Sequence, residues 1–240
     1  MHYILTYFSA EKEMRAQLCK FVHRSYNQNL VTSSSGSFSA RLSAKDDKDI
    51  AFLITPTGVD RCSLEPADLC YISSGGAKAW NGNEPQAKVP RLSKSRFWFH
   101  PSKEAITPSR AATIHATIFE EHPEVNFVMV VQPPYATSYC VTGIPFNSAG
   151  IPESHIILQH VQTLPVYSVL CDDGAALAKA LDPASGKSTV LVEGYGLVTV
   201  GSDLLKTFIQ VEVCESMCGE CSDYLCLFCI IESGSYPAHS

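Results

Sequence analysis

The chain has 240 residues and a mass of 26.2 kDa, enough for one large domain or two small ones. Apolar residues make up 45% and charged residues 18%, which excludes an intrinsically disordered chain. The net charge is −6, and the 18 basic residues form no cluster, which argues against a DNA or RNA partner. No apolar run reaches the roughly 20 residues of a membrane-spanning helix, and the start lacks the basic region of a signal peptide. We therefore expect a cytoplasmic protein without a membrane partner.

Apolar residues near the start of the chain recur first at helical and then at strand spacing. Met14, Leu18 and Phe21 share one helical face, whereas the segment SFSARL alternates with period two, as in a half-buried strand. The first part of the chain is predicted to contain, in order, a helix at 9–26, strands at 37–42 and 50–55, a turn at 56–58, one helical turn at 64–69 and a strand at 70–73.

Residues 74–107 are rich in Gly, Pro, Lys and Ser and contain the aromatic run Phe97-Trp98-Phe99. Connections of this length without regular structure are usually functional or mobile. We interpret this segment as a long surface excursion from a single domain that spans residues 1–240.

The second part of the chain begins with Thr107-Pro108, an N-cap residue followed by proline, which is typical of a helix start. That helix is expected to stop at His122-Pro123. The following elements are predicted, in order, as a strand at 126–131, a helix at 134–143, a strand at 165–170, a helix at 174–182, two strands around a Gly-Tyr-Gly kink at 189–201 and a last helix from Ser202 or Asp203. This alternation predicts a three-layer α/β domain with a mixed sheet.

Five motifs follow one another in the order SFSARL, FLITPTGV, PSRAATIHATIFEEHPEV, VVQPPYAT and LVEGYGLVTVG. With them, the chain resembles the class II aldolase/adducin family over nearly its whole length. The resemblance implies an α/β/α fold, commonly assembled as a C4 tetramer, with a zinc site near a subunit interface. Active members cleave or epimerise sugar phosphates by polarising a carbonyl on zinc and stabilising an enediolate.

The zinc ligands and the catalytic Glu of the family lie in the patterns PSSE, His-x-His-Pro and Asn-His-Gly, and this sequence departs from all three. The ungapped alignment places Ala111 at the Glu position, Val130 and Gln132 at the first two His positions, and Tyr195 at the third. Zinc is held by Cys sulfur, His nitrogen or carboxylate oxygen, so we expect no metal and no other cofactor. A gapped alignment on the string PSKE would keep one carboxylate, Glu104.

Other parts of the family's ligand site are kept. The turn that ends in Thr57 and Gly58 matches the phosphate-binding TPTG, where backbone N–H groups and hydroxyls can hold an anion. Ser109 and Arg110 match the two Ser of PSSE at a helix N-terminus, and Arg can bind a phosphate or carboxylate with two hydrogen bonds. Ser37 replaces the Asn of the segment GN-x-SAR. These five residues are our candidate site for a phosphorylated or carboxylated ligand; alternatively, the turn is kept for its shape and Arg110 points to solvent.

Gln132 and Tyr195 are expected to face one another in the pocket that the metal occupies in the family. An amide and a phenol can donate hydrogen bonds to a carbonyl or enolate oxygen, and Tyr is an occasional general acid. Both are therefore candidate catalytic residues of a metal-independent lyase or isomerase. The alternative is that Tyr195 fills the space of the zinc and that the protein is non-catalytic or repurposed.

Two further groups carry potential metal ligands. His115 lies on the apolar face of its helix and is expected to be a packed structural residue. His155 and His160 are five residues apart and do not share a helical face well. Five cysteines between Cys214 and Cys229 contain two C-x-x-C pairs, which suggest zinc or an iron–sulfur cluster, but their spacing also fits one side of a helix. We expect small buried side chains there, with a metal-binding module as the alternative.

Overall fold

The computed structural model describes residues 2–42, 49–74, 92, 96–100 and 106–232. At its centre lies an eight-stranded sheet in the order β4-β3-β2-β1-β5-β8-β7-β6. The strands are β1 (Ser37–Leu42), β2 (Ala51–Ile54), β3 (Cys70–Ser73), β4 (Trp98–His100), β5 (Phe127–Val131), β6 (Val161–Leu164), β7 (Thr189–Val192) and β8 (Gly196–Gly201). Neighbouring strands are antiparallel except for the parallel pair β6 and β7, so the prediction of a mixed sheet is confirmed.

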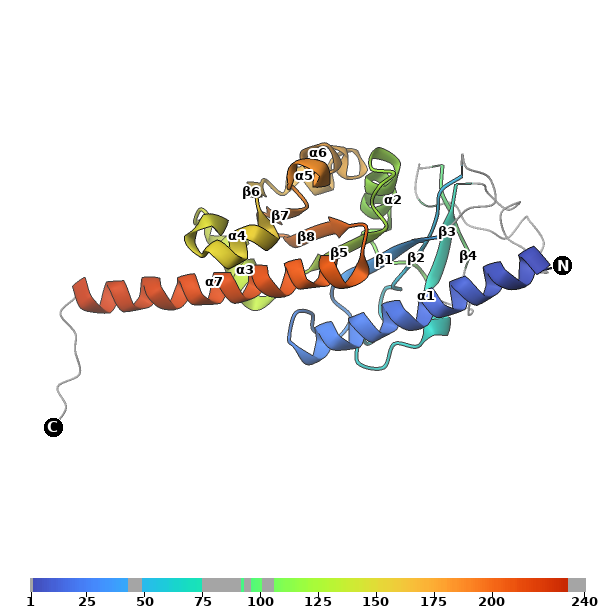
Figure 1. The fold of residues 1–240 in the computed structure, drawn as a ribbon, viewed down its shortest axis with the longest axis horizontal. Coiled ribbons are helices and arrows are strands. Elements are labelled where there is room, and N and C mark those ends of the chain that lie inside the picture. The colour runs from blue at the N-terminus through green and yellow to red at the C-terminus, as the bar shows by residue number, and fades with distance from the viewer. Residues whose placement is uncertain (1, 43–48, 75–91, 93–95, 101–105, 233–240) are drawn as a thin grey trace.

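Helices cover both faces of this sheet (Figure 1). They are α1 (His2–Asn27), α2 (Ala112–Glu121), α3 (Pro134–Thr142), α4 (Pro152–Leu158), α5 (Tyr167–Leu170), α6 (Ala175–Ala180) and α7 (Leu204–Glu232). Figure 1 shows the long helices α1 and α7 along one face and α2, α5 and α6 over the other. The three-layer α/β/α architecture predicted from the sequence is therefore confirmed. No helix among the described residues has both the length and the apolarity needed to cross a membrane.

The two faces of β5 show how the strand sequence produces two cores. Phe127, Met129 and Val131 pack into the cluster with α1, α3 and α7, while Val128 and Val130 pack into the cluster with α2 and α6. Successive side chains of a strand point to opposite faces, so the continuous apolar run suits a strand covered on both sides.

The pairing of β5 with its two neighbours brings distant residues together. Ser37 at the start of β1 lies opposite Val130 near the end of β5. On the other side of β5, Val131 pairs with Leu197, which places the turn before β8 beside Gln132. Gly196, the first residue of β8, has φ 137°, and a Cβ there would lie 2.5 Å from the carbonyl oxygen of Val131, so this close approach requires glycine.

The predicted strand at 165–170 is wrong. The strand in this region is β6, which lies before Pro165, and residues Tyr167–Leu170 form the short helix α5. The apolar residues that suggested a strand are largely exposed, with Tyr167 at 62% and Leu170 at 71% of full exposure. β6 is an edge strand with partly exposed side chains, so its sequence VQTL gave little signal.

Two helix starts also differ from the prediction. α1 begins at His2 instead of residue 9, and α2 begins at Ala112 instead of after Thr107. Pro108 forms a bridge with Pro56, and the Ser109 N–H donates to the Thr55 carbonyl at 3.0 Å. Pro108 and Ser109 are therefore paired with the segment at the end of β2, and a turn follows them before the helix begins at Ala112. The last helix starts as predicted, because the Asp203 carboxylate accepts from the Lys206 N–H at 2.8 Å.

The aromatic run expected on a surface excursion belongs to the sheet. Trp98 and Phe99 lie in β4, which pairs with β3, and Phe97 is fully buried against Phe52, with ring centroids 6.0 Å apart. Aromatic side chains bury more area than others, so this contact ties the segment to the core under α2. Most of the remaining segment between 75 and 105 lies outside the described residues.

Candidate functional site

A cavity of about 570 Å³ lies at one end of α2. The loop before β1, the turn after β2, the start of α2, the end of β5, α5 and the turn before β8 all contribute to its wall. Six of the seven residues predicted for the site line it, namely Ser37, Thr57, Ser109, Arg110, Gln132 and Tyr195, whereas Gly58 does not. Residues as far apart in the sequence as Ser34 and Tyr195 thus meet around one space.

Ser37 has its hydroxyl engaged within the protein. Its Oγ lies 2.7 Å from Nε2 of His115, and Oγ of Ser39 lies 2.6 Å from Nδ1 of the same ring. All three side chains are buried, and burial lowers the pKa of His115 to about 3. His115 is therefore a neutral, packed residue, as predicted, and Ser37 belongs to the cavity floor.

The turn at Thr57 and Gly58 does not offer the backbone donors that its sequence suggested. The Thr57 N–H donates to the Thr107 carbonyl at 2.9 Å, so that donor is already used. Gly58 has φ 72°, which suits glycine, and it is not among the residues that line the cavity. The hydroxyl of Thr57 is the group that this turn can present to a ligand.

Ser109 and Arg110 lie in the turn that precedes α2. Oγ of Ser109 accepts from the Ala111 N–H at 3.3 Å, and the exposed side chain of Arg110 lines the cavity. The charge of Arg110 also acts on Tyr195, where it partly offsets the effect of burial on the pKa. Arg110 therefore places a cation at the rim of the cavity.

Arg61 is a cavity residue that the sequence did not reveal. It is 1% exposed, and its guanidinium donates to the carbonyls of Ser35 at 3.1 Å, Gly36 at 2.8 Å, Pro56 at 3.0 Å and Val59 at 2.9 Å. Burial lowers the pKa of Arg61 to about 10, so it stays protonated at neutral pH. It binds the loop before β1 to the turn after β2 and adds positive charge behind the wall.

Gln132 and Tyr195 both line the cavity and are joined by a hydrogen bond from a side chain to a backbone carbonyl. The amide Nε2 of Gln132 donates to the Tyr195 carbonyl at 3.4 Å, and both side chains line the cavity. Burial raises the pKa of Tyr195, so the phenol keeps its proton and can donate it in a hydrogen bond.

Asp173 supplies a carboxylate that sequence reasoning missed. It lines the cavity from the turn before α6, where Asp172, Asp173 and Gly174 all have left-handed backbones with φ of 49°, 53° and 84°. Left-handed backbone costs a non-glycine residue free energy and is often found at functional sites. Two adjacent Asp residues before a Gly are the sequence signal for such a turn.

The family model described as Class II Aldolase and Adducin N-terminal domain matches residues 16–220. The chain belongs to the class II aldolase and adducin family. The five motifs of the resemblance lie within the matched range.

Individual relatives are distant but span nearly the whole chain. An L-fuculose phosphate aldolase of Methanococcus vannielii is 23% identical over 201 residues, which are 84% of this chain and 91% of the relative. A methylthioribulose-1-phosphate dehydratase of Sorangium cellulosum is 24% identical over 216 residues, covering 88% and 92%. The crystal structure of a sugar-phosphate aldolase from Thermotoga maritima superposes with a TM-score of 0.66 at 17% identity, covering 95% of this chain and 98% of that one.

The class II aldolase family implies zinc, which prefers Cys sulfur, His nitrogen and carboxylate oxygen as ligands. Ala111, Val130, Gln132 and Tyr195, at the positions of the family's catalytic Glu and zinc ligands, all line the cavity. Methyl groups, a carboxamide and a phenol whose pKa is raised by burial do not form a zinc donor set. Glu104 of the gapped alternative lies outside the described residues.

The five C-terminal cysteines, from Cys214 to Cys229, lie on α7, in agreement with the helical spacing in the sequence. Cys214 and Cys218 are fully buried, and Cys221 is partly buried. The pKa of the Cys218 thiol is raised, first by its hydrogen bond with Cys214 and second by burial. Within the described part of the chain, no three His, Cys, Asp or Glu side chains are grouped closely enough to hold a metal ion.

Proposed function

We propose that this class II aldolase-family chain has lost zinc-dependent lyase chemistry and binds a small phosphorylated or carboxylated ligand in the cavity beside α2. The observation that carries the proposal is the composition of that cavity. Arg110 and the hydroxyls of Thr57 and Ser109 supply groups that bind anions, while Val130 and Ala111 stand where metal chemistry would need donors. The protein is then a non-catalytic or repurposed member of its family.

The charges in the cavity wall indicate which polar groups the ligand carries. Arg110 at the rim favours an anionic group, and Asp173 in the same wall favours hydroxyl groups and disfavours a second anion. A sugar phosphate has this polarity, with a charged end and several hydroxyls. Relatives named for L-fuculose phosphate and methylthioribulose 1-phosphate support a ligand of this class.

Thermal unfolding with and without ligand tests the binding proposal. L-fuculose 1-phosphate, and separately inorganic phosphate, should raise the unfolding free energy by RT ln(1 + [L]/Kd). Arg110→Ala should abolish this rise, whereas Arg96→Ala, which removes an exposed arginine that does not line the cavity, should leave it unchanged. An equal rise in Arg110→Ala would refute the anion site.

Metal analysis tests the loss of the zinc centre. The purified chain is expected to carry no stoichiometric zinc after dialysis against zinc-containing buffer without chelator. Zinc that persists when Cys214, Cys218, Cys221, Cys226 and Cys229 are replaced by Ser would contradict the proposal. Zinc that is lost with those cysteines would favour the metal-binding module on α7.

Asp173 favours a second candidate, a metal-independent lyase or isomerase. Its carboxylate would take a proton from the carbon beside a substrate carbonyl, and the C–H electron pair would form the enolate. The phenol of Tyr195 and the free amide N–H of Gln132 would donate to the enolate oxygen. Return of the proton from Asp173 to the former carbonyl carbon, with transfer of the hydroxyl proton of the neighbouring carbon to the former carbonyl oxygen, would complete a ketose–aldose isomerisation.

Hydrogen–deuterium exchange separates the two candidates. A ketose phosphate incubated with the chelator-treated protein in D₂O would exchange the hydrogen beside its carbonyl if the enzyme proposal holds, and Asp173→Asn should stop this exchange. Thermal stabilisation by L-fuculose 1-phosphate without any exchange would instead support the non-catalytic proposal.

We also propose that the chain acts as one domain in a cytoplasmic homo-oligomer, a tetramer by resemblance. Tyr167 and Leu170 on α5 are 62% and 71% exposed, and Leu170 lines the cavity, so a second copy there would cover apolar surface beside the site. Light scattering should give a mass well above 26.2 kDa, and Leu170→Asp should reduce it. A monomeric wild type would refute the assembly.

A further inference from the structure

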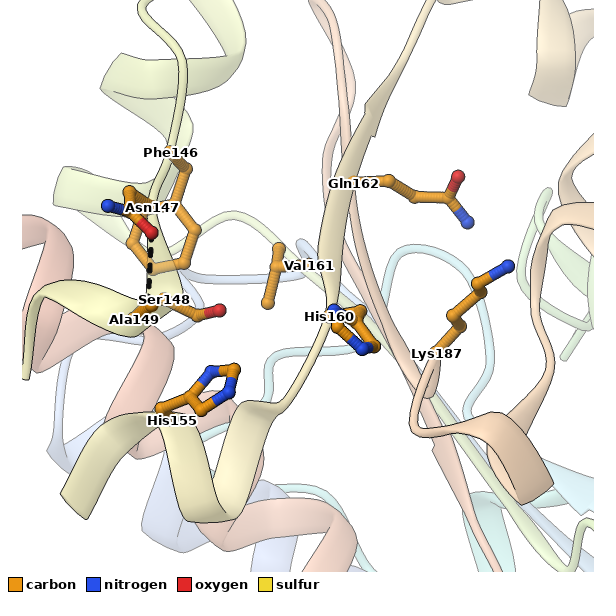
Figure 2. Close-up of a pocket in the computed structure, with 9 residues that line it drawn as sticks. All are labelled: Phe146, Asn147, Ser148, Ala149, His155, His160, Val161, Gln162 and Lys187. Carbon is orange, nitrogen blue, oxygen red and sulfur yellow. Dashed lines mark hydrogen bonds between the residues drawn. The ribbon is translucent and has the colours of Figure 1, made fainter. Parts of the chain in front are cut away.

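A second cavity has a volume of about 330 Å³ and shares no lining residue with the first. The loop before α4, the end of α4, the start of β6 and the turn before β7 form its wall (Figure 2). In the view of Figure 2, the imidazole of His160 lies between that of His155 and the side chain of Lys187. The two rings have centroids 6.2 Å apart and planes inclined by 78°.

Neither of these two histidine side chains has a hydrogen-bond partner among the described residues, unlike His23, His115 and His122. His23, His115 and His122 all bond to carbonyls, hydroxyls or a carboxylate through ring nitrogens. Nδ1 of His155 is buried without a partner among the described residues. A proton on Nδ1 would have no acceptor, whereas a proton on Nε2 could be donated to a ligand.

Lys187 adds a permanent cation to this wall. The His160 N–H donates to the carbonyl of Gly186 at 3.2 Å, so the backbone that carries His160 lies beside the residue before Lys187. No ion pair of Lys187 is found in the part of the chain that the structure describes, and no Asp or Glu lines the cavity. The acceptors of the wall are neutral, namely the amide oxygens of Asn147 and Gln162 and the hydroxyl of Ser148. The carboxylate of Asp182 interacts with the charge of Lys187 but does not line the cavity. The wall therefore carries a cation and no carboxylate in a chain of net charge −6.

We propose that this second cavity binds a small oxyanion, the phosphate or carboxylate group of a metabolite, through His155, His160 and Lys187. The hydroxyl of Ser148 and one amide N–H of Gln162 already donate to the carbonyls of Gln159 and Ala180, so these three side chains, together with the amide N–H groups of Asn147, supply the donors. The volume equals roughly ten waters at about 30 Å³ each, more than a bare phosphate occupies. The rest of the ligand therefore contacts the ring of Phe146.

The spacing of the two rings favours an anion over a metal ion. Two imidazoles on one tetrahedral zinc, with Zn–N bonds of about 2.0 Å, place their centroids roughly 5 Å apart. Hydrogen bonds of about 2.8 Å to different oxygens of one anion allow the wider separation of 6.2 Å seen here. Lys187, a cation, also fits an anion and opposes a divalent metal.

Imidazole NMR signals of the full chain test this site directly. Inorganic phosphate, and separately acetate, is titrated into chelator-treated protein in Hepes buffer. The Cε1–H signals of His155 and His160 should move saturably, while that of the buried His115 stays in place. Saturation by either anion supports the site, and comparison of the two tells whether phosphate or carboxylate is preferred.

Variants separate this site from the cavity beside α2. Lys187→Gln should weaken the response of His155 and His160 roughly tenfold or more, the effect of losing one charge-assisted hydrogen bond. The matched control Lys206→Gln, at an exposed lysine on α7, and Arg110→Ala should leave it unchanged. Unmoved signals, a response in Lys187→Gln equal to wild type, or a response to zinc chloride but to neither anion would overturn the proposal. Because Arg110→Ala removes binding in the first cavity alone, failure of either site can be recognised separately.

Discussion

Ser37 and His115 join the first strand of the central sheet to the helix above it, with Oγ of Ser37 2.7 Å from Nε2 of the ring. The second ring nitrogen is bonded to Ser39 two residues along the same strand, so one imidazole spans both inward hydroxyls of β1. A buried polar group costs free energy unless it is bonded, and here both nitrogens are satisfied. The arrangement fixes α2, and with it Ser109 and Arg110, against the sheet.

Acid should destabilise the protein through His115. Burial lowers the pKa of His115 from 6.5 to about 3, so between these values the unfolded chain binds a proton that the folded chain does not. The contribution of His115 is complete above pH 6.5 and falls by about 1.4 kcal/mol per pH unit as the pH drops toward 3. Urea unfolding of wild type and His115→Gln at pH 7, 6 and 5 measures it. The variant should show the shallower pH dependence and Ser39→Ala the wild-type slope; equal slopes in wild type and His115→Gln would contradict the assignment.

Arg61→Met should lower the unfolding free energy by roughly 3 kcal/mol or more, because four carbonyls that now accept from the guanidinium would lose their donor. Arg61→Lys should recover only part of this loss, since an ammonium cannot reproduce the planar arrangement of donors. Urea unfolding provides the measurement, with Arg96→Met as a control at an exposed ion pair. A cost below about 1 kcal/mol for Arg61→Met would show that the two loops do not depend on it.

Phe97→Ala should cost about 3–5 kcal/mol of unfolding free energy, as for other buried aromatic residues. Phe97 is fully buried against Phe52, whereas Phe99 in the adjoining strand is only partly buried. Phe99→Ala is the matched control and should cost less. If the two substitutions cost the same, the segment from Phe97 is not anchored in the core as described.

Tyr195→Phe should separate binding from chemistry. The phenol has no hydrogen-bond partner among the described residues, so the variant should retain the wild-type unfolding free energy to within about 1 kcal/mol. Its stabilisation by L-fuculose 1-phosphate should change little, because Arg110 holds the anion. If the protein catalyses deuterium exchange, the rate should fall at least roughly tenfold on loss of the donor to the enolate oxygen. An unchanged exchange rate would remove Tyr195 from the mechanism.

The fold could be predicted wherever sequence periodicity and burial coincide. The alternating residues of β1 and the apolar run of β5 are buried in the two cores as their patterns predict. Prediction failed where exposure broke that link. Val166, Tyr167 and Leu170 are apolar yet exposed on α5, while the edge strand β6 is only partly buried. For an exposed apolar helix face and for a sheet edge, the periodicity of apolar residues does not report burial as it does in a core.

The site could be predicted only as far as its motifs extend. Six residues taken from the resemblance meet around one cavity. Arg61 and Asp173 were missed because each lies in a connection whose position is set by tertiary contacts. The occupied N–H of Thr57 could not be foreseen either, because its acceptor at Thr107 is 50 residues away.

The consecutive left-handed residues Asp172, Asp173 and Gly174 imply a trade-off between the stability of the fold and the geometry of the cavity. Replacing Asp172 by glycine would relieve about 1 kcal/mol of backbone strain, so a selection for heat resistance alone should favour it. The same change would give the turn more backbone freedom, so the carboxylate of Asp173 would be held less firmly in the cavity wall. A laboratory lineage evolved only for heat tolerance would then gain robustness while its pocket lost definition.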